Sequence, residues 1–89
     1  MTDEDRNEIR EAVENALESA RSEIAMAEDY ERRAKPYLVS ARCLLREAGV
    51  ERTVAELRAM LGRREGLYTA TDYARAVARE LLDGEAENA

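Results

Sequence analysis

The sequence predicts an all-α protein in which one long N-terminal helix is packed with three shorter helices in a helical bundle. Alanine, glutamate and arginine are the commonest residues, and all three are good helix formers. Apolar residues recur at intervals of three and four, as on one face of a helix, and no segment alternates apolar and polar residues as a half-buried strand does. The single proline and the four glycines stand between these helical stretches.

The first predicted helix covers residues 5–34, with Thr2 or Asp3 as its cap. Acidic residues at its start complement the positive end of the helix dipole. Apolar and small residues form a heptad-like seam along it. We call this set the association seam: Ile9, Val13, Ala16, Ala20, Ile24, Ala27 and Tyr30. Pro36 is expected to end this helix, because the residue before a proline avoids helical backbone angles.

The second predicted helix begins at Pro36, because a proline suits the first position of a helix. It ends at Gly49, where a glycine can adopt the left-handed conformation that closes a helix. Val50 follows and supplies the apolar contact that accompanies such a cap.

Two capping boxes mark the starts of the third and fourth helices. Thr53 is followed three residues later by Glu56, and Thr69 is followed by Asp72. In this motif the threonine and the acidic side chain each satisfy a free backbone N–H group at the helix start. The fourth helix is expected to end at Gly84.

An 89-residue chain suits a single domain, and we assign residues 1–84 to it and 85–89 to a disordered acidic tail. Histidine is absent, which excludes imidazole-based catalytic pairs and imidazole metal ligands. The four glycines stand apart, so no glycine-rich phosphate loop is present. We therefore expect no enzyme activity, no catalytic residue, no cofactor and no bound metal.

The predicted location is the cytoplasm. No run approaches the 18 apolar residues of a membrane span, so we expect no membrane partner. The chain begins with an acidic segment, whereas a secretory signal begins with basic residues. Cys43 is the only cysteine and cannot form an internal disulfide, which is typical of a chain in a reducing compartment.

The net charge of −6 is unevenly distributed. Residues 1–34 carry 11 acidic and 5 basic side chains, whereas residues 35–50 carry 3 basic side chains and 1 acidic one. Nucleic-acid binding draws most of its affinity from lysine and arginine, so the overall balance argues against it. The first helix is expected to carry an acidic face made of Glu4, Glu8, Glu11, Glu14 and Glu18.

These observations favour a small non-enzymatic interaction or regulatory protein whose partner is a second copy of itself. A helix of about 30 residues is about 45 Å long, so the association seam is expected to extend beyond the shorter helices. Its small residues would let a partner helix approach closely. The predicted assembly is a homodimer formed through the seam.

Two alternatives remain open. The first is an acidic inhibitor of the phage or mobile-element type, which would place its acidic face in the basic groove of a nucleic-acid enzyme. The second is a DNA-binding regulator in which the third and fourth helices form a helix-turn-helix. Its candidate DNA contacts are Arg63, Arg64, Arg75 and Arg79.

Overall fold

The computed structural model describes residues 2–26, 31–62 and 64–84. These residues form four helices and no strand, which confirms the all-α prediction. The helices are α1 (Asp3–Met26), α2 (Glu31–Glu47), α3 (Val54–Met60) and α4 (Ala70–Asp83). The predicted acidic tail lies outside the described residues.

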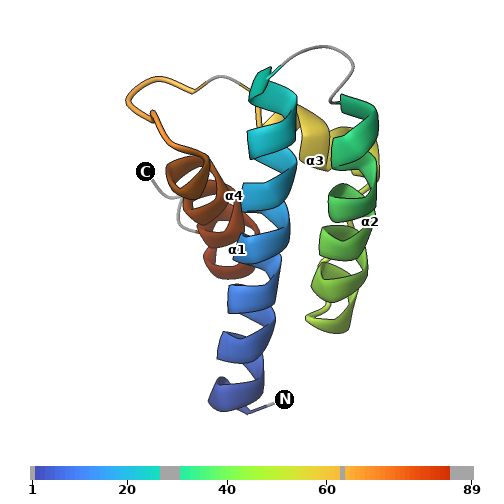
Figure 1. Ribbon diagram of the computed structural model, residues 1–89. Helices are drawn as coiled ribbons and strands as arrows, with labels where there is room; N and C mark the ends of the chain where they lie inside the picture. The colour runs from blue at the N-terminus through green and yellow to red at the C-terminus, as the bar shows by residue number, and fades with distance from the viewer. Residues whose placement is uncertain (1, 27–30, 63, 85–89) are drawn as a thin grey trace.

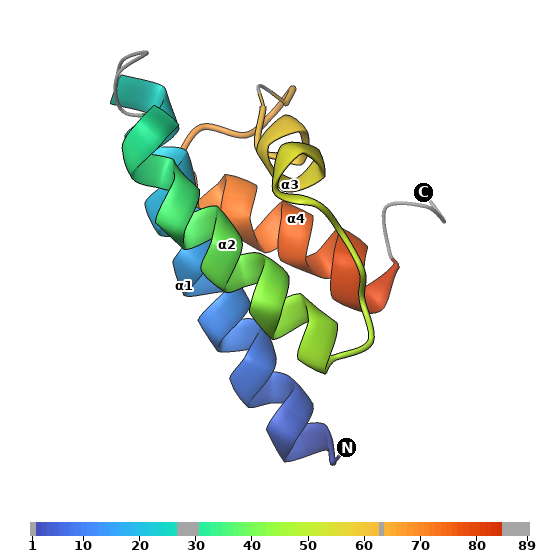
Figure 2. The ribbon, with the colours of Figure 1, turned by 90° about the vertical axis from the view of Figure 1, so that its right-hand side faces the viewer.

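Helix α1 is the longest helix and lies between α2 and α4, packing on both (Figure 1). Helix α2 runs back along α1, and the short helix α3 packs on α2 (Figure 2). The architecture is therefore a helical bundle organised around the long N-terminal helix.

The core is built from the inward faces of all four helices. On α2 the buried positions are Ala34, Leu38, Ala41 and Leu45, at intervals of four, three and four. This is the spacing of one helical face. The other buried core residues are Val13, Leu17, Ala20, Leu57, Leu61, Tyr73, Ala74, Val77, Ala78 and Leu82. Several of them are alanines, which allow helix axes to approach closely.

The predicted boundary between the first two helices is wrong. Helix α1 ends at Met26, α2 already begins at Glu31, and Pro36 lies inside α2. Packing explains the difference, because the buried spacing continues from Ala34 to Leu38 across the proline. Pro36 is itself exposed and lies only five residues after the start of α2. It therefore removes one hydrogen bond near a helix end, on the side that faces water.

The local signals that end and begin the other helices are confirmed. Thr53 accepts a hydrogen bond from the backbone N–H of Glu56 at 3.1 Å, and the Thr53 N–H donates to Glu56 Oε1 at 3.0 Å. Thr69 and Asp72 form the same box before α4. After α2, the Val50 N–H donates to the Leu45 carbonyl at 2.9 Å, as in a glycine-capped helix end.

Glycine fills the positions that close α2 and α4. Gly49 has φ +82° and Gly84 has φ +67°, in the left-handed region that favours glycine. The predicted ends of these two helices are therefore confirmed.

Candidate functional site

The association seam lies largely inside the folded chain. Val13 and Ala20 are fully buried, and Ile9, Ala16 and Ile24 are partly buried against the same core. Ala27 and Tyr30 lie outside the described residues. Because α2 begins at Glu31 rather than at Pro36, it covers more of α1 than the sequence predicts. The five described seam residues thus pack within one chain.

The three arginines of α1 all contact α4. Arg6 donates a hydrogen bond to the carbonyl of Leu82. Arg10 donates two hydrogen bonds to the carboxylate of Asp83, at 2.6 and 2.9 Å. The guanidinium carbon of Arg21 lies 4.0 Å from the centroid of the Tyr73 ring, within the range of a cation–π contact. The cations of α1 are therefore used to hold α4, and they do not lie on the outward face of the helix.

The predicted acidic face divides into two parts. Glu4, Glu8 and Glu11 are exposed, and none of their carboxylates forms an ion pair or hydrogen bond with another described residue. Glu14 and Glu18 are half-buried. Glu18 Oε1 accepts a hydrogen bond of 3.0 Å from the hydroxyl of Thr71 in α4. The exposed acidic face, Glu4, Glu8 and Glu11, is thus the part available to another molecule.

The structure describes three of the four candidate DNA contacts, and they differ in exposure. Arg63 lies outside the described residues. Arg64 is half-buried: its Nε donates to the Met60 carbonyl and its Nη2 to Glu80, both at 2.9 Å. Arg75 and Arg79 are exposed on α4. Nine residues separate α3 from α4, whereas a helix-turn-helix normally has a turn of 3–4 residues.

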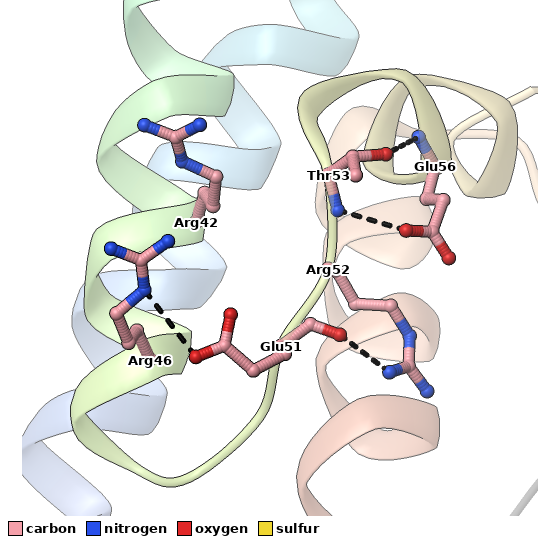
Figure 3. A pocket seen from close by; sticks show the side chains of 6 residues that line it. All are labelled: Arg42, Arg46, Glu51, Arg52, Thr53 and Glu56. Atoms are coloured by element: carbon pink, nitrogen blue, oxygen red, sulfur yellow. Dashed lines mark hydrogen bonds and ion pairs between the residues drawn. The ribbon is translucent and has the colours of Figure 1, made fainter.

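A hollow lies between α2 and the segment that joins it to α3. It has a volume of about 200 Å³ and is lined by Arg42, Arg46, Glu51, Arg52, Thr53 and Glu56. Figure 3 shows Arg42 and Arg46 one above the other on α2, with the Glu51 carboxylate reaching toward Arg46. Arg46 Nε and Glu51 Oε1 are 3.5 Å apart. The Arg52 Nη1 donates to the backbone carbonyl of Glu51 at 2.7 Å.

This hollow was not predicted from the sequence. A signal is present, because Arg42 and Arg46 are one helical turn apart and residues 32–46 contain no acidic side chain. The second wall is supplied by residues 51–56, and nothing in the sequence indicates that this segment returns to α2. The spacing of Arg42 and Arg46 therefore predicts a basic face on this helix, but it does not predict a hollow beside that face.

Two carboxyl groups with lowered pKa values, Glu56 and Asp72, lie at the helix caps. Hydrogen bonds from the backbone and then the side chain of Thr53 hold the pKa of Glu56 below its ordinary value. Thr69 lowers the pKa of Asp72 by the same two contacts. Both shifts favour the charged carboxylate and belong to the ends of α3 and α4. They therefore reflect helix capping rather than acid–base chemistry.

The described residues contain neither a metal-binding cluster nor a membrane-spanning helix. No group of three or more metal-binding side chains is placed to hold an ion within residues 2–26, 31–62 and 64–84. None of the helices in these same ranges is long and apolar enough to cross a membrane. No family model matches the chain, and no curated protein or solved structure matches it.

Proposed function

We propose that the protein is a small non-enzymatic interaction protein and that the outward side of α1 is its association surface. The observation that carries this proposal is the exposed acidic face. Glu4, Glu8 and Glu11 have no counter-charge among the described residues, although α1 contains three arginines. Those arginines contact α4 instead. A partner with a basic surface would provide the missing charge and would be attracted electrostatically.

A second copy of the chain is the first partner to consider. Helix α2 carries five basic residues and two glutamates, and Arg32 and Lys35 are exposed on it. A dimer that placed α1 against α1 would bring like charges together, which is costly. We therefore place the acidic face of one copy against the basic side of α2 of the other. This homodimer differs from one formed through the association seam, whose described residues pack inside the chain.

Light scattering after size exclusion, at low and at high salt, tests the self-association. The wild-type mass at low salt should be near twice 10.0 kDa and should fall to the monomer value at high salt, because salt screens exposed charges. Replacing Glu4, Glu8 and Glu11 by glutamine should give a monomer at low salt. A wild-type monomer at low salt would refute self-association, and a triple variant that remains dimeric would refute the role of α1.

The acidic inhibitor remains the second candidate, and the same exposed carboxylates favour it. Its partner would be the basic groove of a nucleic-acid enzyme. The test is inhibition of a panel of nucleases and polymerases by the monomeric protein. Inhibition should decrease steeply with salt and should be lost in the Glu4, Glu8 and Glu11 glutamine variant. Inhibition that salt does not change would contradict this mode of binding.

A further inference from the structure

We propose that the hollow between α2 and residues 51–56 binds the phosphate group of a small molecule, which Arg42 and Arg46 hold from the α2 side. This proposal rests on the hollow and its arginines at residues 42 and 46, whereas the proposed dimer contact on α2 uses Arg32 and Lys35 near the start of that helix. Arginine suits the task because its planar guanidinium group can donate two parallel hydrogen bonds to an oxyanion.

Arg42 provides the most informative observation. Its Nε is buried and has no hydrogen-bond partner, and no other contact of its guanidinium group is present in the described part of the chain. The Nε atoms of Arg10 and Arg21 are also buried and unpaired, but those guanidinium groups contact Asp83 and Tyr73. A buried donor without an acceptor is costly. An oxyanion in the hollow would give the terminal nitrogens of the Arg42 guanidinium group an acceptor that the described chain does not supply.

The acidic residues of the hollow neutralise its arginines only weakly. Glu56 Oε1 is occupied by the backbone N–H of Thr53. The pair between Arg46 and Glu51 is long, at 3.5 Å, and its side chains are 60% and 74% exposed. By contrast, the structural pairs Arg10–Asp83 and Arg64–Glu80 measure 2.6 and 2.9 Å. An exposed, long pair contributes little, so Glu51 can move away when a stronger anion enters.

The volume of the hollow limits how much of a ligand it can enclose. Its volume of about 200 Å³ is below the roughly 300–1,000 Å³ of pockets that enclose drug-sized molecules. It therefore suits one phosphate group, with the rest of the molecule outside. Arg42 and Arg46 project from the same side of α2 (Figure 3), so both can reach the same anion.

The site is tested by titrating the full chain with inorganic phosphate and recording ¹H–¹⁵N NMR spectra. A titration with sodium chloride at equal ionic strength is the control. Phosphate should shift the Arg42 Nε–H signal and the backbone amides of residues 42–56. Replacing Arg42 or Arg46 by glutamine should weaken binding about ten-fold, which is the effect of losing one charge-assisted hydrogen bond. Arg75→Gln removes the same charge from the exposed side of α4, outside the hollow, and should weaken binding less than about two-fold.

A variant that is expected to bind phosphate more tightly complements the two arginine variants. Glu51→Gln removes the carboxylate that competes for Arg46 and should tighten phosphate binding several-fold. Glu47→Gln removes an exposed charge of the same sign from the end of α2 and should have a smaller effect. This test does not depend on the stability of the arginine variants, because Glu51 is exposed and makes only the loose pair with Arg46 by its side chain.

Adenosine monophosphate, with adenosine as the control that lacks a phosphate group, tests whether the phosphate can be part of a nucleotide. Binding of the nucleotide with the affinity of free phosphate would mean that the hollow contacts the phosphate alone, and tighter binding would add a contact to the nucleoside. The proposal is overturned if phosphate shifts the residues of the hollow no more than chloride does. It is also overturned if Arg75→Gln weakens binding as much as Arg42→Gln.

Discussion

Helices α1 and α2 pack against each other with similar inward faces and present opposite charges outward. Helix α1 carries eight acidic residues and three arginines, a net charge of −5, whereas α2 carries five basic residues and two glutamates, a net charge of +3. On α1 the arginines contact α4, which leaves exposed carboxylates on the opposite side. On α2, Arg42 has no partner in the described chain and Arg46 has only the loose contact with Glu51.

Different residues determine the packing and the surface charge of these two helices. Small and aliphatic residues at intervals of three and four place both helices in the core. The charged residues that point away from the core then give each helix a different outward surface. The inner side of α1 belongs to the fold of the monomer, and the outer sides of α1 and α2 are available to other molecules.

The largest expected effect concerns the inner side of α1. Ala20→Glu would place a carboxylate at a position that is fully buried, and we expect a loss of more than about 4 kcal/mol in the free energy of unfolding. Ser22→Glu, on the exposed side of the same helix, should change it by less than about 0.5 kcal/mol. Urea unfolding followed by circular dichroism measures both. Wild-type stability of Ala20→Glu would contradict the packing of α1 against its neighbours.

The second effect concerns the proline inside α2. Pro36→Ala should stabilise the protein by about 1–3 kcal/mol, because alanine restores a backbone hydrogen bond and fits the helix better. Ser40→Ala is a control one turn later on the exposed side of α2 and should change stability by about 0.5 kcal/mol or less. Thermal unfolding compares the two. A loss of stability in Pro36→Ala would show that the proline has a packing role that its exposure does not indicate.

The third effect is a dependence of stability on pH that arises at the cap of α3, beside the hollow. The folded state lowers the pKa of Glu56, so the charged carboxylate stabilises the fold. This contribution is complete above the ordinary pKa of 4.5 and is lost as the pH falls through the lowered pKa of the folded state.

The glutamine variant isolates that contribution. Glu56→Gln keeps an oxygen that can accept the Thr53 N–H but cannot titrate in this range. Unfolding at a series of pH values from neutral to acidic should show a smaller loss of stability in the variant than in the wild type. Glu65→Gln, which removes an exposed acid from the loop before α4, should follow the wild-type profile. Equal profiles for the wild type and Glu56→Gln would refute the contribution of the cap.

The smallest effect concerns the outer side of α1. Glu4 and Glu8 are four residues apart on the exposed side, where like charges repel. Glu4 also lies in the first turn, where its charge complements the helix dipole, so the repulsion is tested at Glu8. Glu8→Gln should raise the stability of the monomer by about 0.2–0.5 kcal/mol at low salt and by less at high salt. Chemical unfolding at the two salt concentrations measures the difference. A loss of stability at low salt would mean that Glu8 has a favourable partner.

Much of the fold follows from local sequence signals. Thr53 and Thr69 fix the starts of α3 and α4, and Gly49 and Gly84 fix the ends of α2 and α4. Each of these positions depends on residues within one turn, so the sequence predicts it directly. The end of the first helix is different, because the interval of three and four continues from α1 into α2. The pattern cannot separate one long helix from two antiparallel ones, and Pro36 pointed to the wrong boundary.

The surfaces were less predictable than the fold. The sequence identified the acidic residues of α1, but not that Glu18 is held by Thr71 while Glu4 and Glu8 remain unpaired. That difference depends on how α4 crosses α1. The hollow beside Arg42 likewise depends on the path of the chain after α2. Contacts between distant segments decide both features, and they are not visible in the spacing of residues along one helix.

Two variants with the same net charge test whether α1 carries the association surface. One replaces Glu4, Glu8 and Glu11 by glutamine, and the other replaces Glu47, Glu51 and Glu65, so that each changes the net charge from −6 to −3. Both are measured by light scattering at low salt. We expect the α1 variant to be a monomer near 10.0 kDa and the other variant to keep the dimer mass of the wild type. Equal masses for the two variants would contradict the assignment of the association surface to α1.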